Sequence, residues 1–335
     1  MKKITEMTLE ELWELFPITL DDYNPIWKDD YKDEKRKLLS CFKAYKPLSI
    51  EHIGSTAIPN IKAKAIIDIL IEVKHEDFYK FKELIINCGY LLMSETKERM
   101  SFNKGYTEKG YAQKVFHLHL RKEHDHDEIY FRDYLINHID KAKSYEALKM
   151  KLAKQYKHNR DEYTNQKTNF VKEITNKGII EHKLFILSQI ASAFNKNNIT
   201  WNLGASCMLY LRGIVEEFSD IDLFVSKNDI SLAKSILDQY GVIQPNTKSN
   251  SYKTDFFYEY TIEEVDIDLI SGFKILKDHK LYDLSFDDHE RFETIKVNDE
   301  LIYLASLDQW EYFYQIMDRK GKVDLLKKHK NGSDR

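Results

Sequence analysis

The amino-acid sequence predicts an α/β (α+β) fold made of two tandem domains, each a small mixed sheet flanked by helices. A length of 335 residues is long for one domain and comfortable for two. The order helix, strand, glycine-serine turn, helix and acid-bearing strand occurs once in each half. The 5 prolines and 11 glycines are too few for long linkers. We therefore expect domains of 1–177 and 178–335, with a junction at 176–178, where Gly178 can end a helix.

The first half opens with a loop at 17–25 and continues as alternating helices and strands. Apolar residues at helical spacing predict the helices, and runs of branched apolar residues predict buried strands. In chain order we expect a helix at 27–45, a strand from 49 that runs into the turn Gly54-Ser55, a strand at 65–73, a helix at 78–88, a strand at 115–120 and helical segments from 129 to about 177.

The second half repeats this order with a clearer acidic pattern. The same criteria of spacing and composition apply to its elements. We expect a helix at 181–197, a strand at 200–203 that enters the turn Gly204-Ala205-Ser206, a strand at 220–225, a helix at 231–240, two strands within 256–270 and a closing helix at 306–319.

Charge and cysteine content limit the partners and the compartment. The formal net charge of −4 gives no global basic field, so nucleic acid is less expected as a partner than a small molecule or a protein. Cys41, Cys88 and Cys207 are isolated, without metal-ligand spacing or a disulfide framework, which favours a reducing cytoplasm. The charged N-terminus predicts no signal peptide, and no apolar run approaches the roughly 20 residues that span a membrane.

Asp220 and Asp222 form an Asp-x-Asp pair in an otherwise apolar strand, close to the small-residue turn that contains Gly204 and Ser206. Residues two apart on a strand share a face, so the two carboxylates project together. Adjacent carboxylates repel unless a cation lies between them, and their oxygens suit Mg²⁺ that carries a phosphate. The turn offers backbone N–H groups and a hydroxyl to phosphate oxygens.

A later strand supplies a third acid, for which Asp266 and Asp268 compete. Both have the spacing to share one strand face. We favour Asp268, because the Leu269-Ile270-Ser271-Gly272 that follows it resembles the end of the corresponding strand in the nucleotidyltransferase superfamily. Asp266 is then a supporting or exposed strand residue.

The set of turn, Asp-x-Asp strand and later acidic strand resembles the nucleotidyltransferase superfamily related to DNA polymerase β, over roughly 180–330. The resemblance implies transfer of a nucleoside monophosphate from an NTP to a hydroxyl of a small molecule or protein, with Mg²⁺ or Mn²⁺. Asp220 and Asp222 would hold the metal, and Asp268 would complete the site or take the acceptor proton. Gly204 and Ser206 would bind the terminal phosphates.

The first half resembles the GrpB family over nearly all of 15–175. The resemblance rests on 51–59 (Glu-His-Ile-Gly-Ser-Thr-Ala-Ile-Pro), Lys64, 67–69 (Ile-Asp-Ile), 117–119 (His-Leu-His) and 131–135 (Phe-Arg-Asp-Tyr-Leu), with further matches between 142 and 170. It implies a nucleotidyltransferase-like fold. Asn60 stands where the family usually has glycine.

This half lacks the Asp-x-Asp pair, because Ile66 and Leu70 flank its strand acid Asp68. His117 and His119 share a strand face and could compensate, since imidazole suits Mn²⁺ or Zn²⁺ better than Mg²⁺. The residues that would form an anion or nucleotide pocket are Gly54, Ser55, Lys64, Asp68, His117 and His119. An equal alternative is a structural remnant whose polar groups satisfy each other.

Two other functions remain open from the sequence. Both domains could be binding modules without catalysis, with the GrpB-like half recognising a nucleotide-bearing ligand such as a coenzyme A precursor. Alternatively, the halves form a scaffold, which predicts no effect of metal or nucleotide on stability.

Overall fold

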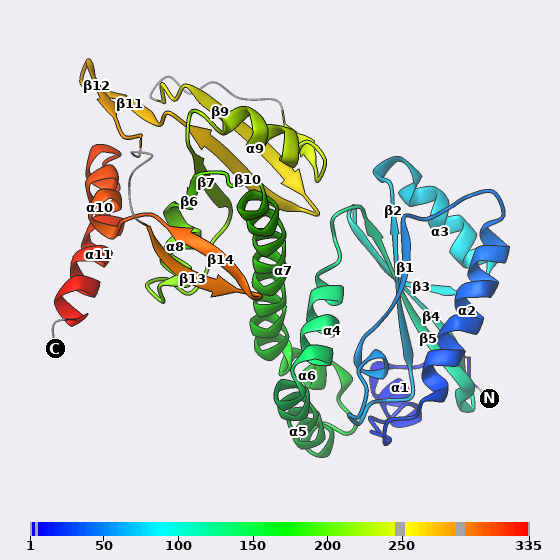
Figure 1. The fold of residues 1–335 in the computed structure, drawn as a ribbon. Helices are drawn as coiled ribbons and strands as arrows, with labels where there is room; N and C mark the ends of the chain where they lie inside the picture. The colour runs from blue at the N-terminus through cyan, green and yellow to red at the C-terminus, as the bar shows by residue number, and fades with distance from the viewer. Residues whose placement is uncertain (1, 4–5, 245–251, 286–291, 334–335) are drawn as a thin grey trace. The chain divides into compact units, whose positions relative to one another are not determined.

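The computed structural model describes residues 2–3, 6–244, 252–285 and 292–333 and divides the chain into two compact units, Met1–Ile179 and Ile180–Arg335. Each unit contains a mixed sheet flanked by helices (Figure 1), so the predicted fold class is confirmed. We call these unit 1 and unit 2.

Unit 1 contains a five-stranded sheet of order β1-β2-β5-β4-β3, in which β2 and β5 are parallel and the other pairs are antiparallel. Its strands are β1 (Ser49–Ile53), β2 (Ile67–Val73), β3 (Leu91–Glu95), β4 (Arg99–Thr107) and β5 (Gly110–Lys122). Its helices are α1 (Leu9–Leu15), α2 (Ile26–Phe42), α3 (Phe78–Asn87), α4 (Asp127–Asn137), α5 (Ile139–Gln155) and α6 (Arg160–Asn165), with short 3₁₀ turns η2 (Ser55–Ala57) and η3 (His75–Asp77).

Strand β2 lies inside the sheet, and nearly all of its residues are buried, as its run of branched apolar side chains predicts. Ile69 and Ile71 belong to one core with Leu38 of α2 and Phe81 of α3. The hairpin β3–β4, absent from the sequence prediction, extends the sheet beyond β5.

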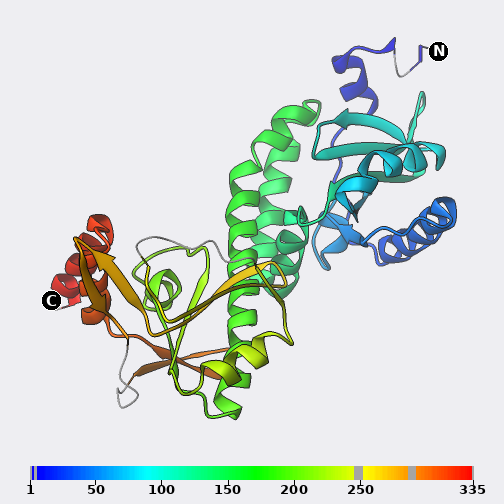
Figure 2. The same cartoon turned by 90° about the horizontal axis from the view of Figure 1, so that it is seen from above.

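Helix α7 (Thr168–Lys196) runs without a break through Gly178, as the long green helix of Figure 2 shows. The expectation that this glycine ends a helix is therefore wrong. A Cβ at Gly178 would lie 2.5 Å from the carbonyl oxygen of Tyr130, so glycine here permits close packing of α7 on α4. The division between the two units falls inside this helix.

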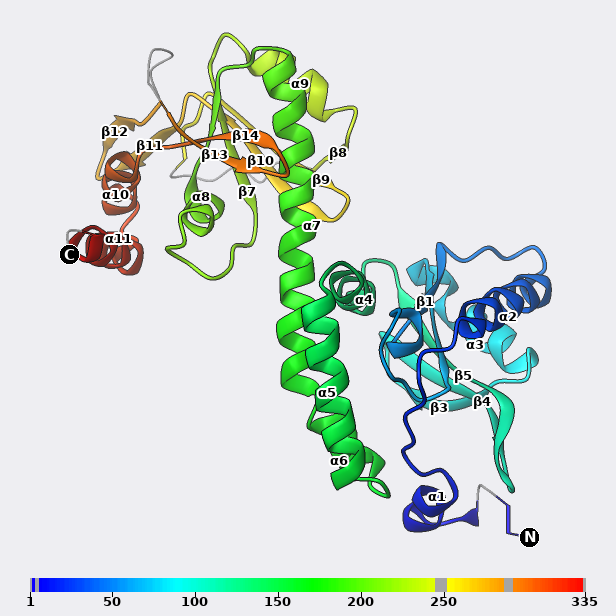
Figure 3. The ribbon, with the colours of Figure 1, turned by 60° about the horizontal axis from the view of Figure 1, so that its bottom comes forward.

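Unit 2 contains a seven-stranded sheet of order β13-β14-β6-β7-β10-β9-β8 and a separate pair, β11-β12. Its strands are β6 (Trp201–Leu203), β7 (Ile221–Val225), β8 (Val242–Ile243), β9 (Phe256–Ile262), β10 (Val265–Ser271), β11 (Lys274–Lys277), β12 (Lys280–Asp283), β13 (Glu293–Val297) and β14 (Glu300–Leu304). Its helices are α8 (Ala205–Leu211), α9 (Ile230–Leu237), α10 (Leu307–Ile316) and α11 (Lys320–Ser333), and Figure 3 shows α10 beside α11.

A disulfide joins Cys41 of α2 to Cys88, the residue that follows α3. The prediction of isolated cysteines is wrong for this pair, because packing of α2 against α3 brings two residues 47 positions apart to a Cα–Cα distance of 6.1 Å, within the range that a disulfide spans. Cys207 is a buried free thiol. The cysteines therefore give no support to the expected reducing compartment.

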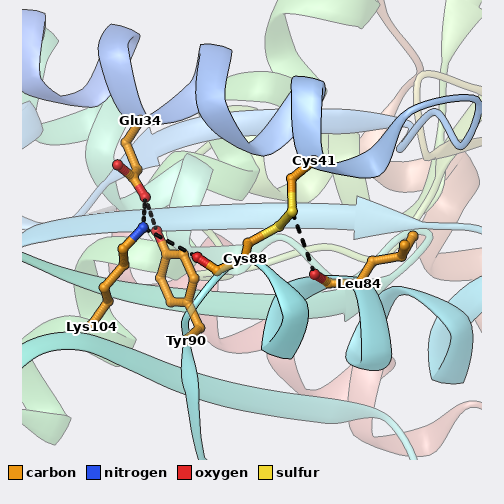
Figure 4. Close-up of a disulfide and its surroundings, with 6 residues drawn as sticks. All are labelled: Glu34, Cys41, Leu84, Cys88, Tyr90 and Lys104. Atoms are coloured by element: carbon orange, nitrogen blue, oxygen red, sulfur yellow. Dashed lines mark hydrogen bonds and ion pairs between the residues drawn. A yellow bond between two sulfur atoms is a disulfide. The ribbon is translucent and has the colours of Figure 1, made fainter.

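Figure 4 shows a buried polar group near this disulfide. The carboxylate of Glu34, 1% exposed, accepts hydrogen bonds from the Tyr90 hydroxyl at 3.1 Å and the Lys104 ammonium at 2.7 Å. The same ammonium lies 3.3 Å from the carbonyl oxygen of Cys88. A buried charge is tolerated when it is paired and hydrogen-bonded in this way.

We expect the double variant Cys41→Ser/Cys88→Ser to lower the free energy of unfolding of unit 1 by about 2–4 kcal/mol, because it removes a cross-link that restricts the unfolded chain. Urea denaturation measures this loss, and the reduced wild-type protein should match the variant. Thiol titration in denaturant should find one free thiol per chain, that of Cys207. Three free thiols in the untreated protein would contradict the cross-link.

Candidate functional site

Three carboxylates of unit 2 meet where two parallel strands lie side by side. Strand β7 pairs with β10 so that Asp222 is directly opposite Asp268. Asp220 immediately precedes β7. Oxygen atoms of the three side chains all lie within 4.8 Å of one another. Within 2–3, 6–244, 252–285 and 292–333, this is the one group of three or more acidic, histidine or cysteine side chains so arranged.

The two candidates for the third acid occupy different places. Asp268 is partly buried in the carboxylate group, whereas Asp266 is exposed and accepts a hydrogen bond from the Thr261 hydroxyl at 3.2 Å. The structure therefore brings Asp268, and not Asp266, together with the Asp-x-Asp pair.

Burial, and after it mutual repulsion, disfavours the charged forms of Asp222 and Asp268. Burial, followed by the charges of Asp220 and Asp268, raises the pKa of Asp222 well above its ordinary value, and Arg319 opposes this effect. Burial, with Asp220, Glu259 and Asp266, raises the pKa of Asp268 to about 7. A divalent cation would remove this repulsion, and carboxylate oxygens are ligands that Mg²⁺ and Mn²⁺ accept. The residues present thus fit a divalent metal.

Gly204 forms the turn beside these acids. Its N–H donates to the carbonyl oxygen of Asp222 at 3.0 Å. A Cβ here would lie 2.4 Å from the Trp310 ring and 2.5 Å from the Phe224 ring, so only glycine allows this close approach. The Ser206 hydroxyl donates to Asp220 at 3.5 Å, and that of Ser219 donates at 3.0 Å.

The three acids and Ser206 line a cavity of about 1010 Å³ in unit 2. Its wall combines aromatic rings with cationic side chains. The aromatic residues are Phe224, Tyr252, Phe256, Phe257, Tyr258, Phe273, Trp310 and Tyr314, and the cationic residues include Lys253, Arg319 and Lys322.

Arg319, Lys322, Tyr252 and Tyr258 all line the cavity. Tyr260 does not, because it is buried and donates to Asp238 at 2.7 Å. Trp310 and Tyr314 also line the cavity, although they are absent from the site residues predicted from the sequence. Their spacing of four on one helix placed both on one face of α10, which was the signal available.

The polar residues predicted in unit 1 also come together. Strand β2 pairs in parallel with β5, and Asp68 is directly opposite His117. The Asp68 carboxylate lies 3.3 Å from Nδ1 of His117 and 3.6 Å from Nε2 of His119. These contacts, strongest for the hydrogen bonds from the two histidines, outweigh burial and hold the pKa of Asp68 far below its ordinary value.

Gly54 lies against the same carboxylate. It has a φ of +70°, and a Cβ there would lie 2.3 Å from the Asp68 carboxylate oxygen. Ser55 follows as the first residue of η2. The ammonium of Lys64 lies 5.7 Å from the ring centroid of Tyr163, whose helix α6 is far along the chain.

Tyr106 and Arg160, which no sequence pattern indicates, complete this arrangement. The Tyr106 hydroxyl lies 2.7 Å from Nε2 of His117. The Arg160 guanidinium donates to the Tyr106 hydroxyl at 3.2 Å and lies 3.3 Å from the same His117 nitrogen. No motif or fixed spacing links these residues, because β4, β5 and α6 bring them together from distant positions.

A family model described as "GrpB protein" matches residues 17–177. Glutamate-rich protein GrpB of Alkalihalophilus pseudofirmus is 34% identical over 166 residues, which cover 48% of this chain and 94% of that protein. The chain belongs to the GrpB family. UPF0157 protein YqkA of Bacillus subtilis is 32% identical over 177 residues, or 51% of this chain, and this GrpB-family chain spans only about half of YqkA's length.

Solved structures give weaker likenesses. GrpB from Enterococcus faecalis aligns with 49% of this chain and 99% of its own, at 27% identity and a TM-score of 0.43. A Thermotoga maritima protein provisionally described as a nucleotidyltransferase aligns with 44% of this chain and 92% of its own, at 18% identity and a TM-score of 0.36. At such scores these likenesses establish no function for the GrpB-family chain.

The register of the two parallel strand pairs allows the units of this GrpB-family chain to be compared directly. Asp222 opposite Asp268 in unit 2 corresponds to Asp68 opposite His117 in unit 1. Two positions before Asp68, where unit 2 has Asp220, unit 1 has the buried Ile66. Unit 1 therefore keeps one of the three carboxylates and pairs it with imidazoles.

In the described part of the chain, no helix combines the length and apolar character that a membrane span requires.

We expect Gly204→Ala to destabilise unit 2 by about 1–3 kcal/mol, because the added methyl group overlaps Trp310 and Phe224. Thermal unfolding measures this loss. Gly321→Ala is the matched control, since Gly321 is an exposed residue of α11 with nothing within 4 Å of an added Cβ. Equal stability of Gly204→Ala and Gly321→Ala would contradict the packing argument.

Proposed function

We propose that unit 2 transfers a nucleoside monophosphate from an NTP to a hydroxyl acceptor and depends on Mg²⁺ or Mn²⁺. The observation that carries this proposal is the meeting of Asp220, Asp222 and Asp268 within 4.8 Å on the wall of a large cavity. Three carboxylates that repel one another are costly unless a cation binds them.

Asp220 and Asp222 would hold the metal, with Asp268 as a further ligand. Bound there, a divalent metal supplies charge neutralisation for phosphate oxygens. In the transfer, an acceptor oxygen forms a bond to the α-phosphorus of the NTP, and the bond from that phosphorus to the bridging oxygen breaks. Pyrophosphate leaves with the electron pair. Asp268, if not a ligand, is placed to take the proton of the acceptor hydroxyl.

The remaining cavity wall suits the rest of a nucleotide. Aromatic faces such as Tyr252, Tyr258 and Trp310 can stack on a base. Arg319, Lys322 and the Ser206 hydroxyl offer positive charge and a donor to the phosphates. With a net charge of −4, we propose a small molecule or a protein, rather than nucleic acid, as the acceptor.

Binding without transfer is the second candidate. It is favoured by unit 1, where Ile66 and His117 occupy the positions of Asp220 and Asp268 and leave one carboxylate. Under this alternative both units recognise a nucleotide-bearing ligand, such as a coenzyme A precursor, and neither carries out chemistry.

Incubation of the whole chain with each α-labelled NTP, Mg²⁺ or Mn²⁺, and an extract of metabolites and proteins tests the proposal. We expect label on an acceptor, and Asp222→Asn should lower the rate by about a thousandfold, since a metal contributes several kcal/mol of charge stabilisation. Asp266→Asn, on the same strand but exposed, is the matched control and should retain activity.

Chelation by EDTA should abolish transfer, and Mg²⁺ should restore it. Metal-dependent NTP binding without transfer would instead support the binding function. Equal transfer by Asp222→Asn and Asp266→Asn would overturn the assignment of the carboxylates.

A further inference from the structure

Three cationic side chains gather around the Asp68 group of unit 1. The ammonium groups of Lys64 and Lys167 lie 5.7 and 4.3 Å from the centroid of the same ring, Tyr163. The Arg160 guanidinium lies against Tyr106 and His117. Its positive charge acts on both lysines. These residues come from the segment before β2, the start of α6 and the residue before α7, so only the fold brings them together.

This cluster has no acidic ion-pair partner within the part of the chain that the structure describes. Across the described ranges, Lys64, Arg160 and Lys167 form no ion pair with an acidic side chain, although each is partly buried. The charge of Asp68 acts on Lys64 and Lys167, but its carboxylate is already in contact with His117 and His119. By contrast, the partly buried Lys104 has an acidic partner, Glu34, at 2.7 Å.

Holding these positive charges together out of water lowers the pKa values of the lysines. Burial, followed by repulsion from Arg160 and Lys167, lowers the pKa of Lys64 to about 7. Burial lowers the pKa of Lys167 to about 8, with Asp68 opposing and Arg160 adding to the effect. Lys149 of α5, close by, also has a pKa lowered to about 7, by burial and then Lys167. A bound anion would reverse these shifts.

We propose that unit 1 binds a phosphate-bearing anion on Lys64, Arg160 and Lys167, beside the Gly54-Ser55 turn. Three cations facing one engaged carboxylate match a ligand with at least two negative charges, which a phosphate ester or pyrophosphate carries. The planar guanidinium can contact two phosphate oxygens at once, while the ammonium groups act as point charges. This site is separate from the proposed transfer site and does not depend on it.

Calorimetric titration of the full chain with pyrophosphate, in EDTA, tests the proposal. We expect Lys64→Met, Arg160→Met and Lys167→Met each to weaken binding at least tenfold. Lys172→Met is the matched control, because Lys172 is exposed on α7 near Lys167 and should bind as the wild type does. No binding by the wild type, or equal binding by all variants, would overturn the proposal.

A parallel titration with ATP separates two sources of the phosphate group. Tighter binding of ATP than of pyrophosphate, lost in Lys64→Met, supports a nucleotide as the ligand. Tighter binding of pyrophosphate, lost in the same variant, supports a free polyphosphate. Because the titration contains no metal and follows binding alone, its outcome is independent of whether unit 2 transfers nucleotides.

Thermal stability distinguishes an anion-binding role of Lys64 from a structural one. A variant that loses an anion-binding lysine should be more stable without the anion, whereas loss of a structural lysine should make the protein less stable. The groups facing Lys64 are Arg160, Lys167, Asp68, His117 and Tyr163. Its folded pKa is below the unfolded value of about 10.4, so the charged lysine costs stability at pH 7 and below, and this cost disappears as the pH rises towards 10.

Without anion, Lys64→Met should therefore have a higher Tm than the wild type at pH 6.5, and the difference should shrink by pH 9.5. With pyrophosphate at pH 6.5, the wild type should gain Tm and Lys64→Met should not. A lower Tm for Lys64→Met at both pH values, with an unchanged response to pyrophosphate, would overturn the proposal.

Discussion

The parallel pairing of β7 with β10 is the constraint on which the candidate site of unit 2 depends. It fixes Asp222 opposite Asp268, and the chain then places Asp220 at the entry to β7. A shift of one residue in this register would turn Asp268 to the other face of the sheet. Buried apolar neighbours such as Ile221 and Ile267 oppose that shift, because it would expose them. The packing of the core thus holds together carboxylates that repel one another.

The same strand arrangement carries different chemistry in unit 1. There the parallel pair β2 and β5 sets Asp68 against His117, which occupies the position of Asp268, while Ile66 occupies that of Asp220. A single carboxylate held by two histidines has little need of a metal to relieve repulsion. The excess positive charge of Lys64 and Arg160 lies around it instead. The two proposals therefore assign an anion to unit 1 and a divalent cation to unit 2.

Local patterns predicted the strands that carry Asp68, Asp222 and Asp268, because alternating or branched apolar runs and glycine turns act over short distances. They missed β3, β4, β8 and β11 to β14. Gly54, Asp68, Asp222 and Asp268 are recognisable this way, and the fold class followed from their repeated order. Local patterns could not predict contacts between residues that are far apart in the sequence. Arg160 reaches His117 across 43 positions, and Cys41 meets Cys88 across 47, since both depend on how helices pack on a finished sheet. The prediction that Gly178 ends a helix was wrong because, in the sequence, a glycine needed for close helix packing looks the same as one that ends a helix.

Helix α7 has a consequence for how the two units respond to ligands. Its first half places Ile174 in a core of unit 1, and its second half places Ile186 and Ile190 in the core of unit 2. Helices form cooperatively, because starting a helix costs far more than extending one. An anion that orders the residues next to the start of α7 therefore lowers the cost of ordering its later turns. Anion binding to unit 1 would then slow amide hydrogen exchange in the later turns of α7, which belong to unit 2.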